Sequence, residues 1–180
     1  MIKDNLSNLL DIDPNSQTKE YKKKETLQRA GKRSSKAFFV QKGLLRSYII
    51  DNKGKEHIFM FASEGWLIAD IESQEFNQPT ELFIDALEDS EVVIFNRECF
   101  TVASLDEGQL KENARLMARR IAVLQRRVIL LMSASAKERY NRFLETYPGL
   151  ANRVPQRMIA SYLGITPQAL STIRGKLHKS

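Results

Sequence analysis

Side chains suited to contacting another surface are concentrated in one stretch near the C-terminus, IASYLGITPQALSTIRGKL, which runs from Ile159 to Leu177. At helical spacing, aliphatic residues of this stretch fall on an inner face, and short or polar residues fall on the opposite face. The outer set consists of Gln168, Ser171, Thr172 and Gly175. Amide and hydroxyl groups form hydrogen bonds, and small side chains let a helix come close to a partner. The stretch therefore predicts a helix that contacts a second surface.

Two short helices joined by a tight turn would position these groups. We expect the first helix over about Gln156 to Leu163, followed by Gly164 in the left-handed conformation of a sharp turn. Thr166 is a suitable N-cap for the second helix and Pro167 a suitable first residue. The expected inner face consists of Ile159, Ala160, Leu163, Leu170, Ile173 and Leu177. This pattern is typical of a helix-turn-helix, although any tight helical hairpin needs similar residues.

The charge of the chain supports a polyanionic partner for this unit. Residues 1–105 carry 14 Lys and Arg against 17 Asp and Glu, whereas residues 106–180 carry 14 against 5. A basic C-terminal part beside a mildly acidic one suits binding of nucleic acid. A capping box at Ser135 and Glu138 predicts one more helix before the helix-turn-helix, ending at Pro148 and Gly149. Basic helices can also simply be solvated, so charge alone does not identify the partner.

A long amphipathic helix is expected between the two parts. Asp106 and Gln109 resemble a capping box, and apolar residues then alternate in steps of four and three, as in a coiled coil. The seam consists of Leu110, Ala114, Met117, Ile121, Leu124, Val128 and Leu131. A helix from Glu107 to about Met132 would be roughly 39 Å long, too long for a small sheet to cover. We predict a parallel homodimer along this seam; the alternative is that it packs only on its own chain's sheet.

The first half of the chain has the pattern of β-strands. Short apolar runs (AFFV, LLRSYII, HIFMFA, WLIADI, LFIDAL and EVVIF) are separated by turn signals such as Asp51 to Gly54 and Glu88 to Ser90. The spacing leaves no room for crossover helices, so the strands should be antiparallel. We predict an α+β fold: a jelly-roll-like antiparallel β-roll over 1–105, a dimerisation helix over 106–132 and a helix-turn-helix domain over 133–180.

From about Lys36 to Leu177 the sequence resembles the Crp-Fnr superfamily of bacterial transcription regulators. The resemblance is carried by VQKGLLRSYIIDNKGKEHIFMF, GWLIADIES, the heptad helix and RMIASYLGITPQALSTIRGKL. It implies a cyclic-nucleotide-binding-like β-roll, a dimerisation helix and a recognition helix in the major groove of double-stranded DNA. The implied DNA-binding set is Arg157, Thr166, Pro167, Gln168, Ser171, Thr172, Arg174 and Lys176. Gln168 is the best base-reading candidate because an amide pairs bidentately with adenine, whereas Arg157, Arg174, Lys176 and Lys179 suit phosphates.

The effector site departs from the superfamily pattern. Cyclic-nucleotide binders have a glycine-glutamate pair and, about ten residues later, an arginine followed by serine or threonine. The matching positions here are Ala69, Asp70, Thr80 and Glu81. No cation remains to meet a cyclic phosphate, and Glu81 would repel it. We therefore predict that the roll does not bind cyclic AMP or GMP in the familiar way, which leaves open a small-molecule effector of unknown chemistry.

Residues for metal or nucleophilic chemistry are few. Cys99 is alone, and His57 and His178 lie far apart in the sequence, so we predict no enzyme activity, no metal and no cofactor. With no apolar run of membrane-span length and no secretion signal, we expect a cytoplasmic protein. Relatives often carry a long basic residue at the position of Thr172 and a β-hairpin wing after the recognition helix. Here the residue is uncharged, and we expect no wing after Leu177. An alternative function is therefore a protein-interaction or ligand-sensing module with weakened operator binding.

Overall fold

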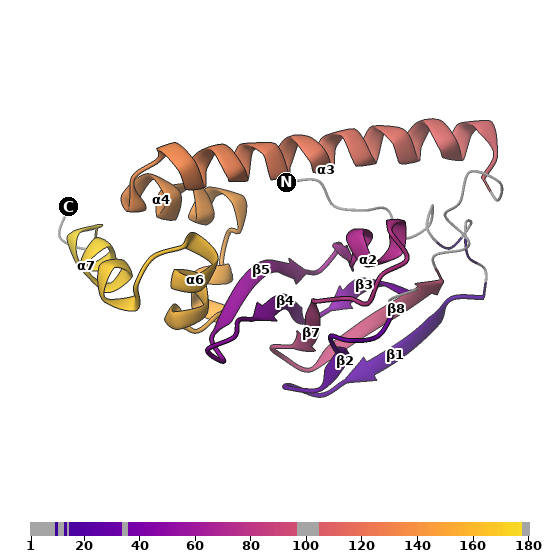
Figure 1. Ribbon diagram of the computed structural model, residues 1–180, viewed down its shortest axis with the longest axis horizontal. Coiled ribbons are helices and arrows are strands. Elements are labelled where there is room, and N and C mark those ends of the chain that lie inside the picture. The colour runs from indigo at the N-terminus through magenta and orange to yellow at the C-terminus, as the bar shows by residue number, and fades with distance from the viewer. Residues whose placement is uncertain (1–9, 11–12, 14, 34–35, 97–104, 178–180) are drawn as a thin grey trace. The chain divides into compact units, whose positions relative to one another are not determined.

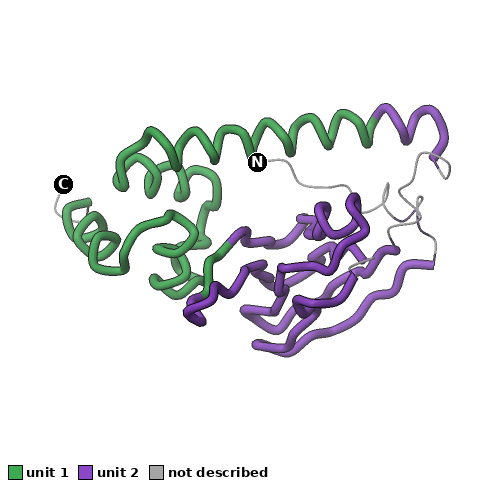
Figure 2. The backbone as a smooth tube through the Cα atoms, viewed as in Figure 1, with its two compact units in different colours: residues 1, 56–58, 112–180 green, residues 2–55, 59–111 purple. Residues whose placement is uncertain are grey.

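The computed structural model describes the chain except for residues 1–9, 11–12, 14, 34–35, 97–104 and 178–180. The chain divides into two compact units, one holding residues 56–58 and 112–180 and the other residues 2–55 and 59–111 (Figure 2). Of the residues named above, Cys99, His178 and Lys179 lie outside the described residues.

The first half of the chain forms two four-stranded antiparallel sheets, which confirms the predicted β class (Figure 1). The strand order is β1-β8-β3-β6 in one sheet and β2-β7-β4-β5 in the other. The strands are β1 Gln17–Tyr21, β2 Thr26–Gln28, β3 Lys36–Lys42, β4 Leu44–Ile50, β5 Glu56–Ser63, β6 Leu67–Ala69, β7 Phe83–Ala86 and β8 Ser90–Asn96. Six of them fall on the apolar runs of the sequence, because each run supplies side chains for the core.

The core of the roll is built from apolar side chains of both sheets. The main cluster contains Phe38, Val40, Leu45, Ile84 and Val92 among its buried members. A second cluster consists of Ala37, Phe39, Val93 and Phe95, on the opposite face of β3 and β8. Both faces of these two central strands are therefore buried. This explains why AFFV and EVVIF read as continuous apolar runs rather than alternating ones.

Two strands and one short helix differ from the sequence expectation. β1 and β2 were not predicted, since four of the five β1 residues are exposed and polar. The run WLIADI was expected to be one strand, but β6 ends at Ala69 and Asp70 caps helix α2, Ile71–Glu75. The Asp70 carboxylate accepts a hydrogen bond from the Ser73 backbone N–H at 3.0 Å. An aspartate at an N-cap satisfies a free helix N–H, which favours a helix start over continuation of the strand.

The second half is helical, as predicted. Its helices are α3 Glu107–Ser133, α4 Ala136–Thr146, α5 Leu150–Arg153, α6 Gln156–Leu163 and α7 Pro167–Leu177. Both expected capping boxes are present: Asp106 and Gln109 exchange side-chain-to-backbone hydrogen bonds before α3, and Ser135 and Glu138 do so before α4. The four-residue helix α5 was not predicted.

Gly43, between β3 and β4, lies where no larger residue fits. Its φ is +98°, and a Cβ at this position would lie 2.7 Å from the Ser90 Cα atom. The backbone N–H of Leu44 donates to the Ser90 hydroxyl oxygen at 3.2 Å, so Ser90 is also held close to this turn. The connection therefore requires glycine both for its backbone angle and for space.

Gly43→Ala should destabilise the protein by more than about 2 kcal/mol, since it combines an unfavourable φ with a backbone clash. Gly54→Ala is the matched control: Gly54 also has a positive φ of +76°, but nothing lies within 4 Å of the added Cβ. The free energy of unfolding of the Gly54→Ala control should fall by only about 1 kcal/mol. Urea unfolding of the two variants measures the difference, and equal losses would contradict the steric explanation.

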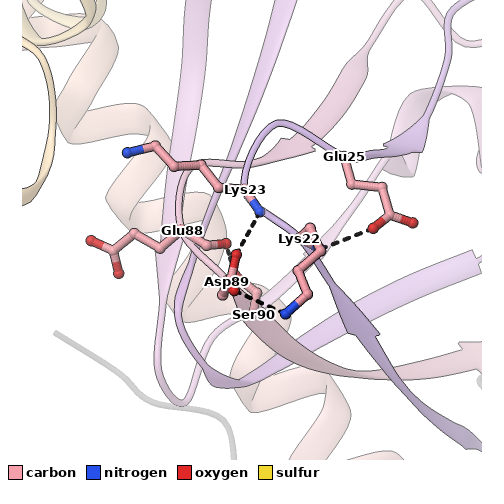
Figure 3. Close-up of polar contacts among 6 residues, drawn as sticks. All are labelled: Lys22, Lys23, Glu25, Glu88, Asp89 and Ser90. Atoms are coloured by element: carbon pink, nitrogen blue, oxygen red, sulfur yellow. Dashed lines mark hydrogen bonds and ion pairs between the residues drawn. The ribbon is translucent and has the colours of Figure 1, made fainter.

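A polar clamp joins the β1–β2 turn to the β7–β8 turn (Figure 3). Asp89 accepts hydrogen bonds from the Lys23 backbone N–H at 2.9 Å and from the Lys22 Nζ atom at 3.0 Å. The Lys22 backbone N–H donates to Glu25 at 2.9 Å. Strand β1 ends at Tyr21, and the three lysines that come next in the sequence lie in the turn.

Because of the clamp, we expect the free energy of unfolding to fall as the pH is lowered into the acid range. The Lys23 backbone N–H and then the Lys22 ammonium lower the pKa of Asp89 below its ordinary value. A carboxylate with a lowered pKa stabilises the fold above its unfolded-state pKa and loses this contribution as pH falls through the folded-state value. Asp89→Asn should therefore unfold at slightly lower urea concentration at pH 7 but match the wild type near pH 3. Glu81→Gln, an exposed carboxylate, is the charge-matched control; a pH-independent difference at position 89 would argue against the clamp.

Candidate nucleic-acid interface

Helices α4, α6 and α7 pack together as the expected three-helix unit (Figure 1). Its centre is filled by apolar side chains. The predicted inner residues Ile159, Ala160, Leu163 and Leu170 are buried, whereas Ile173 and Leu177 are half-buried. Tyr140 and Phe143 of α4 are buried as well, but Leu144 is exposed. The inward stripe of α7 thus fixes the rotation of this helix about its axis, and with it the face that points outward.

The turn between α6 and α7 has the predicted chemistry. Gly164 adopts φ +66° and ψ +37°, and its N–H bonds to the Ala160 and Ser161 carbonyls at the end of α6. The Thr166 hydroxyl oxygen accepts a hydrogen bond from the Ala169 N–H at 3.2 Å, and Pro167 is the first residue of α7. These contacts satisfy backbone groups at both helix ends, so the turn is held without additional loop residues.

Two arginines that the sequence did not single out for this purpose hold the end of α6. The Arg139 Nη1 atom of α4 donates to the Leu163 carbonyl oxygen at 2.8 Å. The Arg127 guanidinium of α3 lies 4.2 Å from the centroid of the Tyr162 ring. A cation beside helix C-terminal carbonyls and a guanidinium over an aromatic face are both favourable. Sequence spacing does not reveal which aromatic ring Arg127 meets.

Aromatic rings fill the space between α4 and α6. The Tyr147 and Tyr162 rings meet edge to face with centroids 5.8 Å apart, and the Phe143 ring lies 5.3 Å from Tyr147. Burial, with a smaller effect from Tyr162, raises the pKa of Tyr147 well above its ordinary value. Tyr147 is therefore a neutral packing residue at physiological pH, and the cluster is a structural support for α6.

The outer face of α7 carries the polar residues as the sequence indicated. Gln168, Ser171 and Thr172 are exposed, and Gly175 would accept a Cβ with nothing within 4 Å. The remaining members of the implied DNA-binding set lie in α6, in the turn and in α7. Arg157, Thr166, Pro167 and Lys176 are exposed, and Arg174 is half-buried. The spacing of 168, 171, 172 and 175 places all four residues on one side of the helix. The residues of this face are small or polar, and none of the four carries a charge.

The heptad seam of α3 is largely uncovered in the single chain. None of the α3 residues is buried. Ile121 and Val128 are 64% and 54% exposed, and Leu124 and Leu131 are exposed too, whereas Leu110 and Met117 are half-buried. Ala114 is exposed. Exposure of a stripe of large aliphatic side chains to water is unfavourable.

The cassette positions of the roll are occupied by the chain's own hydrogen bonds. Asp70 and Thr80 are only 4% and 3% exposed. Besides capping α2, Asp70 accepts a hydrogen bond from the Thr80 hydroxyl group. The Gln28 side-chain amide donates to the Thr80 hydroxyl oxygen at 3.2 Å. Both Asp70 carboxylate oxygens are therefore in use, while Ala69 is half-buried and Glu81 is exposed. The burial of Asp70 and its two hydrogen bonds leave it unsuited to contact a ribose hydroxyl group.

A buried arginine is present in the roll, but an aspartate neutralises it. The Arg46 Nε and Nη2 atoms donate to the two Asp85 carboxylate oxygens at 2.7 and 2.9 Å. The guanidinium also stacks on the Tyr48 ring, 4.0 Å from its centroid. Paired charges of this kind are costly to separate in a buried place. Arg46 is therefore unsuited to binding a cyclic phosphate. This ion pair was not foreseen, since nothing in the spacing of residues 46 and 85 reveals it.

Within the described part of the chain, no group of three or more His, Cys, Asp or Glu residues is placed to hold a metal ion. None of the described helices combines the length and the apolar character needed to cross a membrane.

Known proteins resemble this chain along most of its length. The cyclic nucleotide-binding domain family matches residues 18–103. The fumarate and nitrate reduction regulatory protein of Escherichia coli strain K12 is 28% identical, over 98% of this chain and 73% of its own length. FixK2 from Bradyrhizobium japonicum has a TM-score of 0.75 at 23% identity, covering 91% of this chain and 85% of FixK2. A CooA variant from Carboxydothermus hydrogenoformans has a TM-score of 0.75 at 20% identity, covering 99% and 86%. The two structures share the fold of this chain.

The Asp70–Thr80 hydrogen bond can be tested by its contribution to stability. Thr80→Val keeps the side-chain shape but removes the hydroxyl group, leaving a buried carboxylate oxygen without its donor. We expect a loss of about 1–3 kcal/mol. Thr80→Ser retains the hydroxyl group and should lose clearly less. Urea unfolding at pH 7 measures both, and a valine variant as stable as the serine variant would show that the hydrogen bond contributes little.

Proposed function

Because the chain belongs to the Crp-Fnr superfamily of transcription regulators, we propose that it binds a two-fold DNA operator as a homodimer, with α7 as the recognition helix in the major groove. The observation that carries the proposal is the exposed polar face of α7, which the buried Leu170 holds outward. Gln168 lies in the first turn of this helix, where side chains reach base edges in helix-turn-helix proteins. Its amide suits bidentate pairing with adenine.

The phosphate contacts come from the basic residues around this face. Arg157 is exposed at the start of α6, and Lys176 is exposed near the end of α7. Such residues position the protein on the duplex but do not read its sequence, so base-reading and phosphate-binding positions have different experimental signatures. The small side chains between them let the helix backbone approach the bases closely.

The exposed seam of α3 supports the proposed homodimer. Two copies of α3 packed along Ile121, Leu124, Val128 and Leu131 would bury the aliphatic stripe of each. A two-fold axis along the helix pair presents two recognition helices, which suits an operator with half-sites about one helical turn apart. Both subunits would contribute the same residues to this contact, so a second copy of the chain is a sufficient partner.

Control by cyclic AMP or GMP is not part of the proposal. The positions that would meet the ribose and phosphate carry a buried Asp70–Thr80 hydrogen bond and the exposed carboxylate of Glu81. A phosphate placed there would lack a cation and would face negative charge. Any effector of this roll is therefore expected to differ from a cyclic nucleotide in its chemistry, and calorimetric titration with cyclic AMP should show no micromolar binding.

DNA binding is tested by gel shift of promoter fragments in dilute buffer, with variants of the two residue classes. Gln168→Ala should lose about 1–3 kcal/mol of discrimination at one base pair per half-site with an unchanged salt dependence. Arg157→Gln should weaken binding to all sequences alike and flatten the log-log salt dependence by about 0.9 for each phosphate that is no longer neutralised. If the wild type ignores every fragment at low salt, the alternative of a protein-interaction module with weakened operator binding is favoured.

The dimer is tested by sedimentation of two charge substitutions on α3. Val128 lies in the seam and is 54% exposed, whereas Val123 lies outside it and is 55% exposed. Val128→Glu should give a monomer, because two carboxylates would meet across a desolvated contact. Val123→Glu should stay dimeric. Both variants should keep the helix content of the wild type by circular dichroism, and a monomeric wild type at micromolar concentration would rule the homodimer out.

A further inference from the structure

Thr172 has its only hydroxyl proton committed within its own helix. The Thr172 Oγ1 atom donates to the Gln168 carbonyl oxygen at 3.0 Å, one turn earlier in α7. A threonine hydroxyl has one proton to donate. This contact is the side-chain-to-backbone bond that threonine makes inside helices. Although the residue is exposed, its side chain therefore offers no hydrogen-bond donor to a partner.

What Thr172 still presents is a methyl group and the lone pairs of its oxygen. The oxygen is directed at the backbone of the preceding turn, so the Cγ2 methyl group occupies a different staggered position on Cβ. The neighbours on this face are Gln168, Ser171 and Gly175, none of which carries a charge. A charge-free surface with a methyl group on an exposed residue is suited to an apolar contact. In the major groove the apolar group on a base edge is the thymine C5 methyl.

We propose that Thr172 is a specificity-determining residue that reads a thymine methyl group in each half-site. The inference rests on the proposed binding of α7 to DNA and adds the base that this position selects. Residues four apart on a helix surface have Cβ atoms about 5–6 Å apart. The thymine therefore belongs to the base pair next to the one that Gln168 contacts, or to the one after it.

The competing role for Thr172 is that of a hydrogen-bond acceptor. Its oxygen lone pairs suit the amino group of cytosine or adenine. The two roles depend on different atoms: Thr172→Ser removes the methyl group and keeps the oxygen, whereas Thr172→Val keeps the methyl group and removes the oxygen. Valine and threonine have nearly the same shape and similar helix propensity, so both variants should fold. Circular dichroism and the urea midpoint check this.

The experiment uses the whole 180-residue chain and an operator fragment that the wild type binds. Each thymine is replaced singly by deoxyuridine, which lacks only the C5 methyl group. For the wild type, one position per half-site should weaken binding about four-fold, as expected for the loss of one buried methyl group. Thr172→Val should show the same deoxyuridine sensitivity. Thr172→Ser should bind the thymine and deoxyuridine operators equally, while Gln168→Ala should remain sensitive at the same thymine.

The outcomes separate this inference from the proposed function. Wild-type binding that no deoxyuridine substitution weakens would overturn the role of Thr172 and leave operator binding intact. A serine variant that stays sensitive would overturn it as well, and a valine variant that binds poorly while the serine variant binds well would assign the acceptor role instead. If the wild type binds no duplex at all, the proposed function fails and this inference falls with it.

Discussion

The rotation of α7 is set by the burial of one side chain, and the outward face depends on it. Leu170 is fully buried in a unit whose other inner residues include Ile159 and Ala160, also fully buried. Since side chains three and four residues apart share a helix face, inward Leu170 turns Gln168, Ser171 and Thr172 away from the core. The Gly164 turn and the Thr166 cap then determine where α7 starts. A small apolar centre thus orients the whole polar surface.

In the β-roll, groups of the chain itself supply the partners of the buried polar residues. Asp70 receives hydrogen bonds from Ser73 and Thr80, and Arg46 is paired with Asp85. Buried polar groups require partners whether or not a ligand is present. In this chain the partners come from α2, from the segment just before β7 and, for Arg46, from the neighbouring strand β7. The matched domain family describes the shape of the roll, while the residues at the cassette positions determine what it is able to bind.

Sequence reasoning succeeded where structure depends on neighbouring residues. The capping boxes at Asp106 and Ser135, the Gly164 turn and the apolar runs of six strands are local patterns with direct physical causes. It failed where pairing is distant or weakly encoded. The polar β1 strand is held by β8, more than 70 residues away in the register Gln17 to Ile94. The contacts Arg139–Leu163 and Arg46–Asp85 depend on the assembled fold, and spacing along the chain does not specify them.

The stacking of Arg127 on Tyr162 gives α3 a second mechanical role. Arg127 is the residue directly before Val128 of the seam, and its guanidinium lies against the aromatic cluster that supports α6. Rotation of α3 about its own axis would therefore displace Tyr162 or break the stack. Rotation of α3 is thus coupled to the orientation of α6. The stiffness of this single cation–π contact limits how independently α3 and α6 move.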